Sequence, residues 1–293
     1  MRPYGGLIGA NPTTASAAIS SAAGGVWSLR DAERLKRAGT WPTSPAIPQT
    51  ISGLQLWLDG SDASTLYDAT TGGSLVAADG AVARWEDKSG NARHATQGTA
   101  NSRPVRKTAQ LNNLDGLDFD GTNDSFSVNS VAQFFSGSNK EFTIFGVAKT
   151  DVTGSQQDFF STGNSGNNNQ NVRAGWNNGS QKLLVARESD LGLDIVGKIV
   201  TGGTNLGTAA KVATWRGGAS NGSLFLNGVS DATAADLTGS ATINVASVGV
   251  LPRLTPAVYF NGLIFEVVIY DSALSDTNRA AVESYLMTKW GIS

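Results

Sequence analysis

The sequence predicts an all-β protein built as an antiparallel sandwich. Two observations lead to this fold class. Nine segments between residues 53 and 271 are short, rich in β-branched or aromatic residues, and separated by Gly, Asn, Asp and Ser. An Asn-Gly pair at residues 227 and 228 follows the alternating segment Ser223 to Leu226, which is the signal of a hairpin with a type I′ turn. Such spacing favours a sandwich over a βαβ fold, and 293 residues fit one large domain with an extension.

The last predicted strand differs from the others. In residues 261–271 both alternating sets are largely apolar, and only Glu266 interrupts them. This pattern predicts a strand inside a sheet that is covered on both faces. The three tryptophans Trp57, Trp85 and Trp215 lie in strand segments and are expected in the core. The predicted strands are residues 53–59, 81–87, 116–121, 141–150, 181–188, 209–217, 222–228, 241–250 and 261–271.

Residues 1–50 are predicted to form an arm that precedes the domain of residues 51–293. Residues 1–23 are small and polar, a composition that does not fold alone. From Ser28 the pattern predicts a helix of about three turns that ends at Gly39, because Pro42 forbids its continuation. Three prolines in residues 40–50 then predict an extended linker.

A second helix is predicted at the C-terminus. Ser275 is its expected N-cap, Gly291 its end, and an apolar stripe runs along one face. This stripe indicates that the helix packs on the side of the sandwich. Its residues are Val282, Tyr285, Leu286 and Trp290.

Composition excludes several kinds of site. The net charge is −2, which gives no reason to expect nucleic acid or a membrane as partner. The chain has no cysteine and a single histidine, His94, so disulfides, thiolate metal sites and His-cluster metal sites are excluded. We see neither a signal-peptide pattern nor a membrane span, and expect a protein made in the cytoplasm.

Five ordered motifs resemble the laminin-G-like branch of the concanavalin-A-like lectin/glucanase superfamily. They are GLQLWLDGSDASTLY, ARWEDKSGNARHATQ, GLDFDGTNDSF, KVATWRGG followed by GSLFLNGV, and LIFEVVIYDSALSDTNRAAVESYLMTKWG. The resemblance covers about residues 51–293. It implies a jelly-roll sandwich of two antiparallel sheets.

The stretch GGVWSLRDAERLKRAGTWP (24–42) is similar to a shorter segment found in structural proteins of tailed bacteriophages. This similarity implies that the arm attaches the protein to a phage particle. A helix this short is marginal alone, so its apolar residues need a surface to pack against. We predict that the arm contacts other virion proteins through Trp27, Leu29, Arg30, Arg34, Leu35, Arg37 and Trp41.

Catalytic motifs are missing from the sequence. Glycosidases of the superfamily carry E-x-D-x-E or E-x-D-x-x-E on one strand, and the nearest pattern, Glu188-Ser-Asp190, lacks the third carboxylate at either spacing. His94 stands in a turn-like segment without a G-x-S-x-G elbow, which favours a structural or surface role. The sequence therefore predicts a protein that is not an enzyme. The alternative is a glycan-active enzyme, a hydrolase or polysaccharide lyase, on the same fold.

A calcium site is a further prediction, because the laminin-G-like resemblance implies one Ca²⁺ held by oxygen ligands. The oxygen-rich turns that match family motifs contain Asp87 and Asn91 in WEDKSGN, and Asp120, Asn123 and Asp124 in FDGTND. A second interpretation stays open. These Asp and Asn side chains could instead cap turns through hydrogen bonds to backbone N–H groups.

The Asn-rich stretch of residues 153–181 suggests a glycan site. Amide side chains and stacking rings are the usual components of lectin sites, and the rings here are Phe159, Phe160 and Trp176. The alternative is that the two phenylalanines belong to a strand and the asparagines fill a loop.

These features together predict a non-enzymatic structural or adhesion protein of a tailed-phage virion, in several copies per particle. The arm would anchor it as a decoration, fibre or tail appendage. The lectin-like domain would face outward and bind host-surface polysaccharide.

Overall fold

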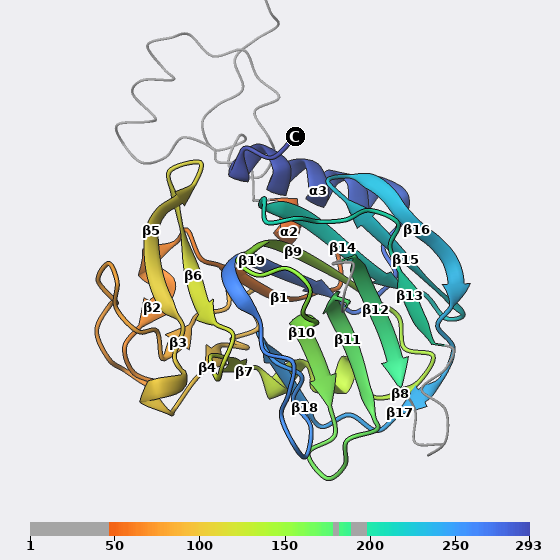
Figure 1. Cartoon of the computed structure of the whole chain (residues 1–293), viewed down its shortest axis with the longest axis horizontal. Helices are drawn as coiled ribbons and strands as arrows, with labels where there is room; N and C mark the ends of the chain where they lie inside the picture. Colours follow the sequence, from red (N-terminus) through yellow and green to blue (C-terminus); the bar gives the residue numbers. More distant parts are fainter. Residues whose placement is uncertain (1–46, 178–181, 189–197) are drawn as a thin grey trace, which may run out of the picture. The chain divides into compact units, whose positions relative to one another are not determined.

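The computed structural model describes residues 47–177, 182–188 and 198–293 (Figure 1). The boundary between the two units of the chain falls between Thr50 and Ile51. In the first unit, α2 (Ile47–Thr50) is a single helical turn where the sequence predicted an extended linker. Proline is tolerated in the first turn of a helix, so Pro48 does not prevent it. The predicted helix that starts at Ser28 lies outside the described residues.

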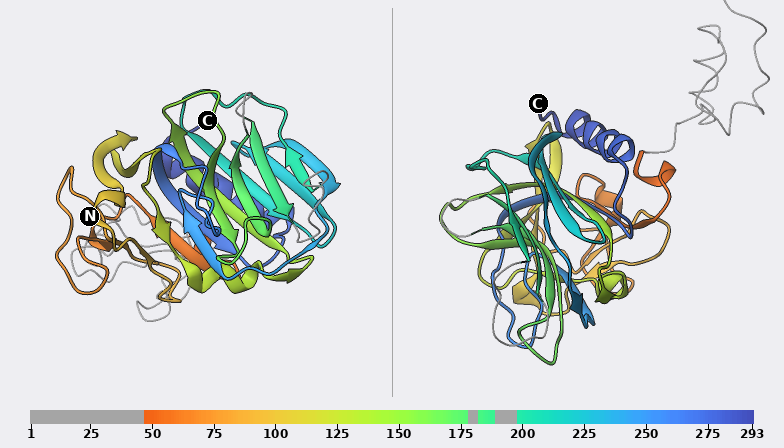
Figure 2. Two further views of the ribbon diagram at one scale, coloured as in Figure 1. Left: turned by 60° about the horizontal axis from the view of Figure 1, so that its bottom comes forward. Right: turned by 90° about the vertical axis from the view of Figure 1, so that its right-hand side faces the viewer.

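The second unit is a sandwich of two large sheets, and every pairing between their strands is antiparallel (Figures 1 and 2). Sheet A has eight strands in the order β16, β15, β14, β9, β19, β6 and β5, with β1 paired to β19 beyond the end of β6. Its strands are β1 (Leu54–Asp59), β5 (Val105–Leu111), β6 (Leu114–Asp120), β9 (Phe142–Thr150), β14 (Lys211–Gly217), β15 (Asn221–Leu226), β16 (Val229–Asp236) and β19 (Asn261–Tyr270).

Sheet B has nine strands in the order β13, β12, β11, β10, β18, β7, β4, β3 and β2. They are β2 (Leu66–Tyr67), β3 (Arg84–Trp85), β4 (Ala95–Thr96), β7 (Phe126–Ser127), β10 (Gln157–Gly163), β11 (Asn171–Trp176), β12 (Leu183–Glu188), β13 (Ile199–Thr201) and β18 (Val245–Val248). A small ribbon pairs β8 (Gly137–Ser138) with β17 (Ser240–Ala241), and three 3₁₀ turns are η1 (Ala63–Thr65), η2 (Ala100–Ser102) and η3 (Asn129–Phe134).

The sandwich confirms the predicted fold class, and most predicted strands are present within one or two residues. Two are much shorter than predicted. Residues 81–87 contain only β3, and residues 241–250 contain β18 and the last residue of β17. The Asn227-Gly228 turn joins β15 to β16 with φ angles of 47° and 77°, which are the two positive values of a type I′ turn. Trp57, Trp85 and Trp215 are buried, as predicted.

The central strand β19 is covered on both faces, as its sequence predicted. Its residues from Ile264 to Tyr270 have no exposed surface, and Glu266 is among them. One face joins the core between the sheets, and helix α3 (Asp276–Trp290) packs over the outer face of sheet A. Contacts between α3 and strands β9 and β14 place it there, and Figure 1 shows it along the top of the domain.

Helix α3 begins and ends at the predicted caps. The Ser275 hydroxyl accepts a hydrogen bond from the Asn278 N–H, and Gly291 takes the left-handed conformation with φ 64°. Val282, Leu286 and Trp290 are fully buried. None of the helices within residues 47–177, 182–188 and 198–293 is long and apolar enough to cross a membrane.

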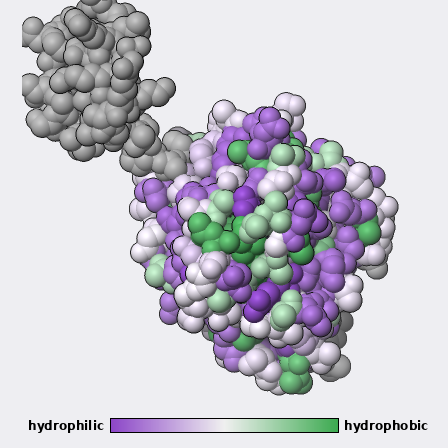
Figure 3. Space-filling view, turned by 90° about the vertical axis from the view of Figure 1, so that its left-hand side faces the viewer, coloured by the Kyte–Doolittle hydropathy of each residue, from purple (hydrophilic) through white to green (hydrophobic). Residues whose placement is uncertain are grey.

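One side of the domain, at the left of Figure 1, carries the short strands β2 to β4 and the β5–β6 hairpin. Figure 3 shows this side, where hydrophilic residues surround a smaller hydrophobic area near the centre. The hairpin turns at Asn112 and Asn113, both with positive φ. The Asn112 amide then donates to the Lys289 carbonyl at 2.9 Å, so the hairpin tip is bonded to the last turn of α3.

Candidate functional site

The first predicted calcium turn is organised by Asp87. Its Oδ1 accepts from the backbone N–H groups of Trp57 (2.9 Å) and Ser89 (2.8 Å), and its Oδ2 accepts from the Ser89 hydroxyl and the Arg93 N–H. The Asn91 amide nitrogen donates to carbonyl groups of β1. The carboxylate therefore ties the turn to β1 through N–H and O–H donors.

The second predicted calcium turn is closed by Asp120. Its Oδ1 accepts from the N–H groups of Thr122 (2.8 Å), Asn123 (3.0 Å) and Asp124 (3.3 Å), and Asp124 Oδ2 accepts from the Asp120 N–H. Burial alone would raise the pKa of Asp120, but these N–H donors lower it. Burial raises the pKa of Asp124 to about 6, and the nearby Asp120 and Asp118 add to this.

Both turns thus adopt the capping arrangement, the second interpretation of their sequence. Among the described residues, no group of three or more His, Asp or Glu side chains is arranged to hold a metal ion. Calcium binding at these turns stays a prediction. His94 also takes a structural role, because its Nδ1 accepts from the Asp87 N–H at 3.1 Å.

The predicted stacking rings Phe159, Phe160 and Trp176 were assigned wrongly as a glycan surface. All three lie in the core between the sheets, with at most 2% of their surface exposed. A bulge between Asp158 and Phe160 in β10 accompanies the burial of two consecutive phenylalanines. Phe159 stacks on Trp215 with ring centroids 5.3 Å apart, so no sugar can reach these rings.

The asparagines of residues 164–170 shape the β10–β11 loop. Asn164 Oδ1 accepts from the Gly166 N–H, Asn167 Oδ1 from the N–H groups of residues 169 and 170, and Asn168 Oδ1 from the Thr255 N–H. Their oxygens are used within the protein, which supports the loop interpretation. The predicted partner-binding residues of the arm, Trp27, Leu29, Arg30, Arg34, Leu35, Arg37 and Trp41, lie outside the described residues.

A polar cluster that the sequence analysis missed lies on the outer face of sheet B. Phe160 pairs with Ala174 and both face the core, so the next pair, Ser161 and Arg173, points to the opposite face. We call this group the sheet B cluster. It consists of Asp158 and Ser161 on β10, Asn171 and Arg173 on β11, and Glu188 on β12.

The sheet B cluster is held rigidly by its own hydrogen bonds. Arg173 donates from Nε (3.0 Å) and Nη2 (2.7 Å) to the two oxygens of Asp158, and the Ser161 hydroxyl donates to Asp158 Oδ2 at 2.6 Å. Asn171 Nδ2 donates to Glu188 Oε2 at 2.7 Å, and Arg173 Nη1 lies 3.8 Å from Glu188 Oε1. Burial alone would lower the pKa of Arg173, but Asp158 and Glu188 raise it.

Only part of the sheet B cluster remains available to a ligand. Asp158 is fully buried and its carboxylate is occupied, whereas the side chains of Arg173 and Glu188 are each 10% exposed. Asn171 is fully buried, and its Oδ1 has no hydrogen-bond partner. The cluster thus presents a carboxylate and a guanidinium group at one place on the sheet.

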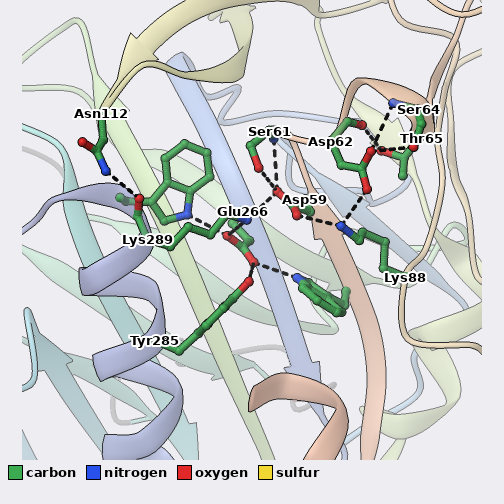
Figure 4. A network of polar contacts seen from close by, with 12 residues as sticks. Asp59, Ser61, Asp62, Ser64, Thr65, Lys88, Asn112, Glu266, Tyr285 and Lys289 are labelled. Carbon is green, nitrogen blue, oxygen red and sulfur yellow. Dashed lines mark hydrogen bonds and ion pairs between the residues drawn. The ribbon is translucent and has the colours of Figure 1, made fainter. Parts of the chain in front are cut away.

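A second polar group, which we call the α3 network, lies between sheet A and helix α3 (Figure 4). Glu266 at its centre accepts from the indole N–H groups of Trp57 (2.7 Å) and Trp290 (2.6 Å) and from Lys289 Nζ (2.7 Å). Lys289 Nζ also donates to Asp59 Oδ1 at 2.6 Å. Two carboxylates therefore share one partly buried ammonium group.

Lys88 completes the α3 network by donating to Asp59 Oδ2 at 2.9 Å and to Asp62 Oδ2 at 2.7 Å. Burial and the neighbouring Asp59 raise the pKa of Glu266. Burial alone would raise the pKa of Asp59 as well, but Lys289, together with Ser61 and Lys88, lowers it. The two carboxyl groups therefore differ in how readily they hold a proton.

Comparison with known proteins gives similarity at the level of fold. No protein-family model matches the chain, and no curated protein matches it. Among solved structures, it is similar to the CBM40 module of the Ruminococcus gnavus IT-sialidase bound to α2,3 sialyllactose. The identity is 19%, over 57% of this chain and 95% of that chain, with a TM-score of 0.48.

The chain is also similar to the Trypanosoma rangeli sialidase. The identity is 13%, over 83% of this chain and 34% of that one, with a TM-score of 0.50. At this identity the similarity concerns the fold alone, and it agrees with the sandwich of two antiparallel sheets.

Proposed function

We propose that the chain is a non-enzymatic structural or adhesion protein of a tailed-phage particle. Its domain of residues 51–293 binds host-surface polysaccharide on the outer face of sheet B, and its arm of residues 1–50 attaches it to other virion proteins. The sheet B cluster is the observation that carries the binding part of this proposal.

The two outer faces of the sandwich favour sheet B as the binding face. The outer face of sheet A is covered by α3. On sheet B, Glu188 offers a carboxylate that accepts from sugar hydroxyl groups, and the guanidinium of Arg173 lies beside it with the same 10% exposure. Because the Asp158–Arg173 pair fixes these groups, little conformational entropy is lost when a ligand binds.

The same geometry argues against glycoside hydrolysis. Hydrolysis uses two carboxyl groups that both reach the scissile bond. In the sheet B cluster Asp158 is fully buried against Arg173, which leaves Glu188 as the accessible carboxylate. The close pair Asp59 and Glu266 lies under α3 and binds Lys289. A non-enzymatic role accounts for both arrangements.

The attachment part of the proposal rests on the sequence of the arm. Residues 24–42 resemble a segment of phage structural proteins. Residues 1–50 hold five basic against two acidic residues, whereas the whole chain is acidic by two charges. A basic arm suits attachment to an acidic surface on a neighbouring virion protein. Particles assembled with a chain lacking residues 1–50 should not contain the protein, and normal incorporation would refute this part.

Binding is tested by calorimetric titration of the full chain with purified host-surface polysaccharide. Glu188→Gln should weaken binding about tenfold, because a hydrogen bond to a charged group is worth about 1.5–3 kcal/mol. Asp151→Asn is the matched control, since this exposed carboxylate forms an ion pair with Lys149 at 3.3 Å. Equal affinity of the two variants would refute the site, and release of new reducing ends would establish the enzymatic alternative.

A further inference from the structure

The α3 network brings an amine and two carboxyl groups together in a buried position. Lys289 Nζ lies 2.6 Å from Asp59 Oδ1 and 2.7 Å from Glu266 Oε2. The exposed fractions of the three side chains are 17%, 6% and 0% in that order. Figure 4 shows Lys289 reaching from α3 to Asp59 on β1 and Glu266 on β19. Two carboxyl groups around Lys289 are more than an ion pair needs, because one carboxylate would neutralise the ammonium group.

We propose that Lys289 and Asp59 condense into an intramolecular amide bond, with Glu266 transferring the proton. The product is a covalent cross-link between β1 and the last turn of α3. Nothing in this step depends on whether the domain binds glycans.

The positions of the reacting atoms suit this reaction. A carbon–oxygen bond adds about 1.2 Å, so Lys289 Nζ lies less than about 4 Å from the Asp59 carboxyl carbon. Well-oriented groups in one molecule react as if at effective concentrations of about 10⁵–10⁸ M. Three separate elements, β1, β19 and α3, fix the groups, so the folded chain supplies the orientation that free amines and acids lack.

Hydrogen-bond donors surround the Asp59 carboxyl group and make its carbon more electrophilic. Ser61 donates to Oδ1 from its N–H (3.1 Å) and from its hydroxyl (2.6 Å), and Lys88 donates to Oδ2 at 2.9 Å. These donors also stabilise the negative charge that develops on oxygen when the amine attacks. Burial raises the pKa of Glu266, which favours its acceptance of a proton from Lys289.

The step balances without any further reactant. The Lys289 ammonium gives one proton to Glu266, and the free amine attacks the Asp59 carboxyl carbon to form a C–N bond. One C–O bond of Asp59 then breaks. The departing oxygen takes the proton from Glu266 and the second proton from the nitrogen, and it leaves as water. Glu266 is regenerated, and no oxidation or reduction occurs.

Asp59 is the electrophile and Glu266 the proton carrier because their surroundings differ. Glu266 is fully enclosed, and the indole N–H groups of Trp57 and Trp290 hold both of its oxygens. Water released from Glu266 would have no exit. Asp59 borders Lys88, whose side chain is 25% exposed, so water can leave there.

The cross-link would join residues that lie 230 positions apart in a chain with no cysteine. It would therefore close most of the domain into one covalent loop, as a disulfide does in other proteins.

Intact mass spectrometry of the purified full chain tests the proposal. We expect the measured mass to be one water below the mass calculated from the sequence. Fragmentation should place this loss on a linked pair of peptides that contain Asp59 and Lys289. Lys289→Arg and Glu266→Gln should both keep the full mass. Lys107→Arg is the control, because Lys107 pairs with the exposed Asp79, and it should show the same loss as the unsubstituted chain.

The unsubstituted chain decides the outcome even if a variant does not fold. A full sequence mass after prolonged incubation of the folded protein would overturn the proposal. So would a link to Glu266 in place of Asp59, or an undiminished water loss in folded Lys289→Arg.

Discussion

Replacing Asp158 with asparagine should lower the free energy of unfolding of the domain, because the substitution breaks the buried ion pair with Arg173. The substitution keeps the shape of the side chain but removes its charge, and its amide NH₂ presents donors to the guanidinium donors. Removal of one partner from a buried ion pair costs about 3–5 kcal/mol. Glu188 remains 3.8 Å from Arg173 and compensates part of the charge, so we expect about 3 kcal/mol.

Urea denaturation followed by fluorescence measures this loss, and the thermal midpoint should fall by about 6–12 °C for a domain of this size. Asp151→Asn makes the same chemical change in an exposed ion pair and should cost less than about 0.5 kcal/mol. The double variant Asp158→Asn with Arg173→Met should recover part of the loss, because no uncompensated charge is left in the sheet. A loss below about 1 kcal/mol for Asp158→Asn alone would show that the pair does not hold β10 to β11.

Three further outcomes follow from individual residues. Folding raises the pKa of Asp124 to about 6, so the folded chain binds more protons than the unfolded chain and its stability falls as the pH rises from about 4 to 6. In urea titrations, Asp124→Asn should therefore be about 1–3 kcal/mol more stable than the unsubstituted chain at pH 7.5 and equally stable at pH 4. Val258 has φ 58°, which strains a β-branched residue, and Val258→Gly should raise the free energy of unfolding by about 0.5–1 kcal/mol. Chelation with EDTA should leave the melting temperature unchanged, because backbone N–H groups already satisfy Asp87 and Asp120; a fall that added Ca²⁺ reverses would establish the calcium site.

Local patterns in the sequence were enough to predict the frame of the domain. The strand at residues 261–271, the Asn227-Gly228 turn and the caps at Ser275 and Gly291 all depend on neighbouring residues, and all are present. Such features are fixed by backbone geometry and by burial of short segments. They can be recognised without knowing which strands pair.

The sheet B cluster depends on pairing between strands, and no local pattern revealed it. Strand β10 breaks the apolar alternation of a strand with two consecutive phenylalanines. Strand β11 alternates Val172, Ala174 and Trp176 with polar or small residues, but it is only six residues long. The charges of the cluster meet only because β11 lies between β10 and β12. Phe159 was misassigned for the same reason, since its burial requires the bulge in β10 and the facing sheet.

A charged residue inside a strand has different consequences on the two outer faces of the sandwich. On sheet A, both oxygens of Glu266 have protein donors and α3 closes the site, so the groups there can react only with each other. On sheet B, the side chains of Glu188 and Arg173 are each 10% exposed, so we expect external hydroxyl groups to bind there. The two proposals are therefore separable. The Glu188→Gln variant should still have a mass one water below the mass calculated from its own sequence. Lys289→Arg should leave the affinity for glycan unchanged.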